Sequence, residues 1–130
     1  MITLHVEGLP PAALGDSASI DTQLRGSISA ENGPTLITLR TSNEMLRIGV
    51  GHDTGDSVAL FLDRAAEPWH AVGPCLSIHA ASLEFRSGSS IYSFDGELRI
   101  PEADTRAAAR QFIETATRPD LLAWRREQRK

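Results

Sequence analysis

Cysteine, aromatic residues and long apolar runs are all scarce in this chain of 130 residues. Cys75 stands alone, which excludes an intramolecular disulfide and fits a reducing compartment. Aromatic residues are only 5% of the chain, so Val, Ile, Leu and Ala must fill most of the core. The apolar runs are far short of a membrane span, and the N-terminus shows neither a basic leader nor a secretory apolar stretch. We therefore expect a cytoplasmic protein that does not enter a membrane.

The rest of the composition is typical of a folded acidic domain. Apolar residues make up 41% of the chain, enough for a core, and the length suits one domain spanning 1–130. The net charge of -4 is uneven, because residues 1–104 carry a balance of -8 and residues 105–130 a balance of +4. The acidic body disfavours nucleic acid as a ligand, since phosphates would be repelled, and suits a basic protein partner. The basic tail is explained by cations near a helix C-terminus.

Segments of alternating or continuous apolar residues predict strands along most of the chain. These segments are 2–7, 36–40, 45–51, 58–63, 69–73, 76–78, 82–85 and 90–94. Connections of two to six polar residues indicate antiparallel hairpins, because parallel strands need long crossovers. The predicted fold is α+β, with a single antiparallel sheet of about five to six strands and an N-terminal and a C-terminal helix packed on one face.

The N-terminal helix is predicted over 18–30. Ile20, Leu24 and Ile28 recur there every four residues, and a polar residue before them suits an N-cap. Gly26 weakens this helix by about 1 kcal/mol.

The C-terminal helix has a clearer pattern. Pro101 suits a first helical position, and the acidic residues after it favour the positive end of the helix. One apolar stripe follows at the i, i+3, i+4, i+7 spacing, formed by Ala109, Phe112, Ile113 and Ala116. Pro119 forbids continuation of the helix. Trp124 is expected to fold back onto the core, because exposing it forfeits roughly 2–3 kcal/mol.

Two groups of residues resemble parts of a catalytic or metal site, and each has a simpler explanation. His52 and Asp53 lie beside Asp56 in a glycine-rich segment, but a solvated hairpin turn also favours Asp and Gly. Cys75 with His70 or His79 would need an activated thiolate in an electropositive pocket, which sequence proximity does not supply. We therefore predict no catalytic residue, no cofactor and no metal site. A small hydrolase that uses His52/Asp53 or Cys75/His70 remains an alternative, as does a generic α+β adaptor.

Several segments together resemble immunity protein family one, in their order and spacing. The resemblance covers about residues 35–126. The segments that carry it are 46–53, 58–63 and 69–73 as central hairpins, 94–101 as the entry to the last helix, and 107–113, Thr115, Arg118-Pro119 and Trp124 as that helix, its end and its anchor.

This resemblance implies binding without catalysis. Members of the family are cytoplasmic antidotes to polymorphic toxins, often nucleic-acid deaminases, so the chain is expected to cover the active-site cleft of a cognate toxin. A toxin that acts on nucleic acid needs a positive cleft, which an acidic loop face can occupy. The expected acidic contacts are Asp53, Asp56, Asp63, Glu67, Asp95 and Glu97. Trp69 and Tyr92 are the expected aromatic anchors. We expect the free protein to be a monomer.

Overall fold

The fold is given by a computed structural model of the chain. It describes residues 2–5, 12–14, 34–41, 44–52, 55–62, 68–72, 82–87, 90–94 and 98–126. The predicted N-terminal helix over 18–30 and the predicted strand over 76–78 lie outside these ranges.

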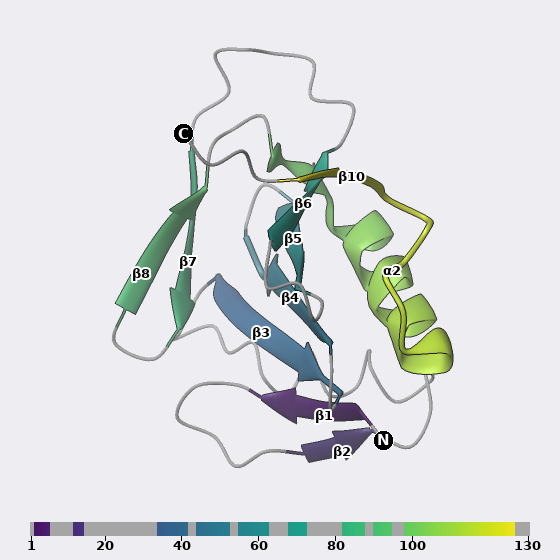
Figure 1. The fold of residues 1–130 in the computed structure, drawn as a ribbon. Coiled ribbons are helices and arrows are strands. Elements are labelled where there is room, and N and C mark those ends of the chain that lie inside the picture. The colour runs from purple at the N-terminus through teal and green to yellow at the C-terminus, as the bar shows by residue number, and fades with distance from the viewer. Residues whose placement is uncertain are drawn as a thin grey trace.

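Strands dominate the described residues (Figure 1). In chain order the elements are β1 (Ile2–His5), β2 (Ala12–Leu14), β3 (Thr35–Arg40), β4 (Met45–Val50), β5 (Asp56–Leu62), β6 (Pro68–Val72), β7 (Leu83–Ser87), β8 (Ser90–Phe94), β9 (Ile100–Pro101), α2 (Glu102–Thr115) and β10 (Ala123–Arg126). The strands predicted at 36–40, 45–51, 58–63, 69–73 and 90–94 are confirmed to within two residues at each end.

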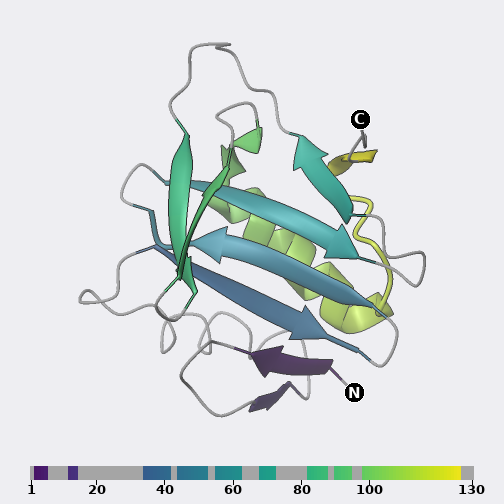
Figure 2. The same cartoon turned by 60° about the vertical axis from the view of Figure 1, so that its left-hand side comes forward.

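The predicted fold class is wrong. The strands form one curled sheet in the order β10-β6-β5-β4-β3-β1-β2, larger than five or six strands (Figures 1 and 2). The sheet is also mixed, because β7 meets β3 in parallel at Thr35 and Arg86, and the Arg86 amide donates to the Pro34 carbonyl at 2.8 Å. One helix, α2, occurs in the described ranges, where two helices on an antiparallel sheet were expected.

Two-sided burial of the central strands explains this difference. Neighbouring residues such as Leu36 and Ile37 on β3, or Val58 and Ala59 on β5, are buried although they point to opposite faces of the sheet. A sheet whose two faces are both apolar needs cover on both sides. Figure 2 shows α2 behind the sheet and the β7–β8 hairpin in front of it.

The helix covers the larger core. Ala109 and Phe112 of the predicted stripe are buried there, and Ile113 packs at its margin. The sheet side of this cluster contributes Ile37, Leu39, Leu46, Ile48, Val50, Ala59, Phe61 and Ala71. Trp124 packs against the same cluster, with its ring centroid 6.2 Å from that of Phe61, so the predicted return of Trp124 to the core is confirmed.

The β7–β8 hairpin covers one end of the opposite face. Its Leu83 and Phe85 are buried together with Leu36, Val58 and Leu98. The Phe85 ring lies directly on β4, where a Cβ built on Gly49 would stand 2.8 Å from three ring carbons. Gly49 is therefore needed for the close approach of hairpin and sheet.

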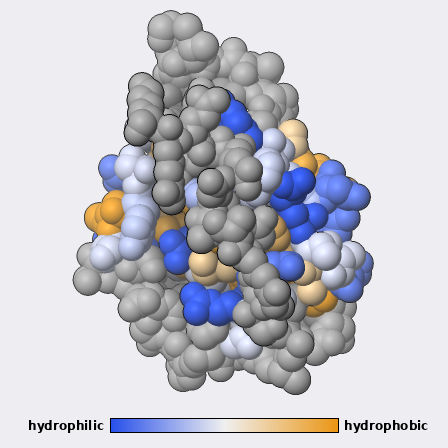
Figure 3. All heavy atoms as spheres, viewed as in Figure 1, coloured by the Kyte–Doolittle hydropathy of each residue, from blue (hydrophilic) through white to orange (hydrophobic). Residues whose placement is uncertain are grey.

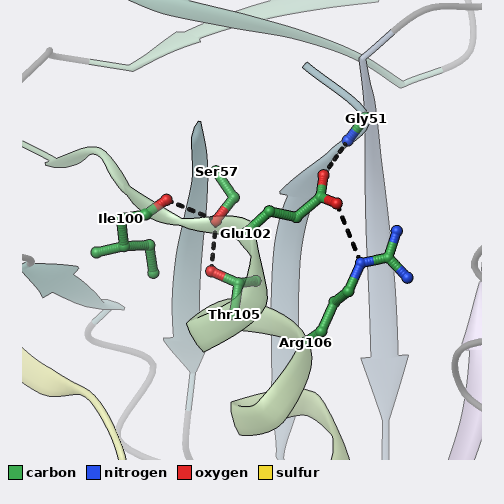
Figure 4. Close-up of polar contacts among 6 residues, drawn as sticks. All are labelled: Gly51, Ser57, Ile100, Glu102, Thr105 and Arg106. Carbon is green, nitrogen blue, oxygen red and sulfur yellow. Dashed lines mark hydrogen bonds and ion pairs between the residues drawn. The ribbon is translucent and has the colours of Figure 1, made fainter. Parts of the chain in front are cut away.

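Polar contacts fix the start of α2 (Figure 4). One carboxylate oxygen of Glu102 accepts the Gly51 amide at 2.7 Å, and the other accepts Arg106 Nε at 3.1 Å. Beside them the Ser57 hydroxyl donates to the Ile100 carbonyl at 3.0 Å and lies 2.5 Å from the Thr105 hydroxyl. Ser57 and Thr105 are fully buried, so this pair satisfies polar groups inside the core.

The described helix does not reach across a bilayer, since α2 has neither the length nor the apolarity for that.

Gly49→Ala should destabilise the fold by about 1–3 kcal/mol, because the new methyl group overlaps the Phe85 ring. Denaturant unfolding measures this cost in the natural chain and in a Phe85→Leu background, where the cost should shrink. Gly55→Ala is the matched control. Its φ of 78° makes alanine unfavourable, but nothing lies within 4 Å, so its cost should not depend on residue 85. An equal Gly49→Ala cost in both backgrounds would contradict the proposed contact.

Ser57→Ala should cost about 1–3 kcal/mol, because it removes the partner of both the Ile100 carbonyl and the Thr105 hydroxyl. Thr105→Val should cost less, since Ser57 keeps its bond to Ile100. Thermal and denaturant unfolding of the two variants show which one loses more stability. A larger loss for Thr105→Val would show that Thr105 has the more important hydrogen bonds.

Candidate binding surface

The segment 116–122 between α2 and β10, called the corner below, leaves the end of the helix and returns beside it to β10 (Figure 1). The helix ends at Thr115, and Ala116 turns the chain away with φ 55° and ψ 25°, its amide still donating to the Phe112 carbonyl at 2.7 Å. Pro119 follows and is buried, in agreement with the predicted end of the helix. The predicted stripe is wrong at its last position, because Ala116 is exposed and lies outside the helix.

Gln111 connects the helix to this corner. Its side-chain amide nitrogen donates to the Asp120 carboxylate at 2.5 Å, and its side-chain oxygen accepts the Leu121 amide at 3.2 Å. The indole nitrogen of Trp124 donates to the Pro119 carbonyl at 2.6 Å. Three hydrogen bonds thus fix residues 119–121 between the helix and β10, which limits the conformational entropy that binding would remove.

This corner holds an arginine on an aromatic ring. Arg118 is exposed, and its guanidinium carbon lies 4.2 Å from the ring centroid of Trp69 on β6, a cation–π distance. Trp69 is half-buried and also packs against the helix-side core. Leu121, three residues after Arg118, is 60% exposed. We call Trp69, Arg118 and Leu121 the Trp69–Arg118 surface.

The residue types of this surface are those that dominate binding energy in protein interfaces. Trp and Arg are enriched among hot spots, where a rigid aromatic ring offers contact area at low entropic cost. Exposed leucine adds apolar area that a partner can cover. The surface therefore has the chemistry of a protein-binding site.

The predicted toxin contacts have different surroundings in the structure. Asp56 begins β5, and one of its carboxylate oxygens accepts a hydrogen bond from Arg99 at 2.6 Å, so this charge is compensated within the chain. Trp69 on β6 and Tyr92 on β8 lie on strands that are not neighbours. The remaining predicted contacts, Asp53, Asp63, Glu67, Asp95 and Glu97, lie outside the described residues.

The residues of the hydrolase alternative are only partly described. The His52 ring stands 6.2 Å from Phe85 in an edge-on contact, whereas His70 lies on β6 opposite Leu60. Asp53 and Cys75 are outside the described ranges. Within those ranges no three His, Cys, Asp or Glu side chains gather as metal ligands would.

Sequence reasoning named Trp69 but missed Arg118 and Leu121 as surface residues. The Arg118–Trp69 contact depends on how β6 and β10 pair, with Trp69 opposite Arg126, and no local pattern encodes that pairing. The signal available in the sequence was the Arg-Pro helix end followed by two leucines.

Comparison with protein-family models found no match to this chain, and comparison with curated proteins found none. The resemblance to immunity protein family one therefore stays a prediction.

Gln111→Ala should loosen this corner with little effect on global stability, because the contacts it removes are exposed. We expect amide exchange at Leu121 to accelerate by about tenfold, equivalent to one lost hydrogen bond. Asp120→Ala is the matched control, since it removes the other contact of Gln111 and leaves the Gln111 side-chain oxygen to accept the Leu121 amide. Amide hydrogen exchange at Leu121 is measured by NMR in the natural chain and in both variants. An unchanged Leu121 rate in Gln111→Ala would mean that Gln111 does not order the corner.

Proposed function

We propose that this protein is an immunity protein. It binds the toxin domain of a polymorphic-toxin system, and this toxin domain is a nucleic-acid deaminase. The protein covers the active-site cleft of the toxin domain and carries out no reaction of its own. The proposal places the protein in the cytoplasm of the cell that makes the toxin, where the toxin would otherwise act.

The observation that carries the proposal is the Trp69–Arg118 surface. It combines a stacked arginine, an aromatic ring supported by the core and an exposed leucine on a hydrogen-bonded corner. An inhibitor that must bind tightly benefits from such pre-organisation, because little flexibility is lost on association.

Charge supports the same proposal at longer range. The balance of -8 over residues 1–104 attracts a basic domain and accelerates encounter, whereas short-range contacts decide how long the complex lives. The acidic residues 1–104 would thus attract the toxin domain at long range, and the Trp69–Arg118 surface would make the apolar and stacking contacts with it.

The test is binding to the candidate toxin domain encoded beside the gene for this chain. The natural chain should form a complex and protect cells that express the toxin. Leu121→Asp and Arg118→Glu should each weaken the complex by at least about tenfold. Arg40→Glu reverses the charge of another exposed arginine and should change the affinity by less than about twofold.

Two results would contradict different parts of the proposal. If the natural chain forms no complex and gives no protection, the immunity function is wrong. If it protects but all three variants bind equally well, the function stands and the Trp69–Arg118 surface is not the contact.

A further inference from the structure

Strand β8 is exposed along almost its whole length. Ser90, Ile91, Tyr92 and Ser93 are all exposed, with Ile91 60% and Tyr92 44% accessible. β8 pairs only with β7 among the described strands, so in this part of the chain its other side is an open edge. Figure 3 shows a small hydrophobic patch among weakly polar residues on the flank where Figure 1 places β8.

The outer strands β8 and β10 differ in how well they are protected against pairing with a strand of another molecule. Natural sheets protect open edges with charged residues, proline or bulges. The β10 edge carries Arg125 and Arg126, whereas Ser90–Phe94 contains no charge and no proline. The β8 edge therefore lacks the usual protection, although it presents a large aliphatic and an aromatic side chain.

The register of the hairpin shows which backbone groups are open. Ser87 lies opposite Ser90, with two residues between them. In a hairpin with a two-residue loop, the residues on either side of the loop form a hydrogen-bonded pair, so Ser87 and Ser90 are such a pair. Pairs then alternate along the hairpin, and Tyr92 also bonds to β7. Ile91 and Ser93 consequently direct their amides and carbonyls away from β7, toward the open edge.

We propose that this edge pairs with β8 of a second copy of the chain, antiparallel and around a two-fold axis at Tyr92. In this register Ile91 lies opposite Ser93 of the partner copy, so the open backbone groups of one copy meet those of the other in four hydrogen bonds. Tyr92 lies opposite its own counterpart, and Ser90 lies opposite Phe94.

A second copy fits this edge better than a strand of arbitrary sequence. A two-fold axis perpendicular to the sheet places the same face of both copies on the same side. In this register the outward-pointing amides and carbonyls of one copy also meet those of the other. No β8 residue meets a charge in this pairing, since all five are uncharged. The short overlap indicates a weak, concentration-dependent dimer. The inference does not rest on the proposed function, because it uses β8 and not the Trp69–Arg118 surface.

A disulfide trap tests the register. Tyr92 faces its counterpart in a non-hydrogen-bonded pair, where Cα atoms are about 4.5 Å apart and a disulfide can close. In a Cys75→Ser background, Tyr92→Cys should form covalent dimers with oxidised glutathione at least about tenfold faster than Ser90→Cys. The two Ser90 positions would be about 13 Å apart, four residues along the strand. Equal rates, or faster closure at position 90, would overturn the register.

Sedimentation of the unmodified chain tests the dimer itself. The average mass should rise from monomer toward dimer between about 10 µM and about 1 mM, the range of weak association. Ile91→Lys and Ser93→Pro should abolish this rise. Glu114→Lys, which changes an exposed charge on α2, on the opposite side of the sheet from the hairpin, should preserve it. Circular dichroism confirms that each variant is folded. A monomer at all concentrations, as the sequence alone led us to expect, or an unchanged Ile91→Lys, would overturn the proposal.

Discussion

The central strands β3, β4 and β5 bury side chains on both faces, and the rest of the architecture depends on this constraint. Helix α2 covers one face of these strands and buries Ala109 and Phe112 against it. The other is covered at one end by the β7–β8 hairpin, which approaches closely because Gly49 leaves room for the Phe85 ring. Since the hairpin lies over the face, only its inner strand reaches the sheet, and its outer strand is left open to solvent.

Local patterns were sufficient to predict most of the strands and the last helix. Apolar alternation located β4, a largely apolar run located β5, and the 3.6-residue stripe with Pro101 before it located α2. The fold class depends on contacts that no local pattern records. The parallel contact of Thr35 with Arg86 joins distant segments, and β10 is a strand because its backbone completes the edge of β6. The adjacent buried pairs Leu36-Ile37 and Val58-Ala59 were a signal for cover on both faces.

The candidate surface was predictable only in part. Trp69 was predicted to be an aromatic anchor from its residue type, and the structure places its side chain half-buried. Its contact with Arg118 follows from the return of the chain after α2, which Trp124 stabilises by packing on Phe61. Asp56 illustrates the opposite case, because its ion pair with Arg99 joins β5 to the segment before β9. Sequence position alone could not distinguish an acid held within the chain from one available to a partner.

Helix α2 is tied to the rest of the molecule at both ends. Glu102 binds the Gly51 amide at its start, and Gln111 bonds to the chain that leads into β10 near its end. A helix anchored in this way has no free end from which fraying can spread. Its amides should therefore open together with those of the sheet, whereas the exposed corner can still open locally.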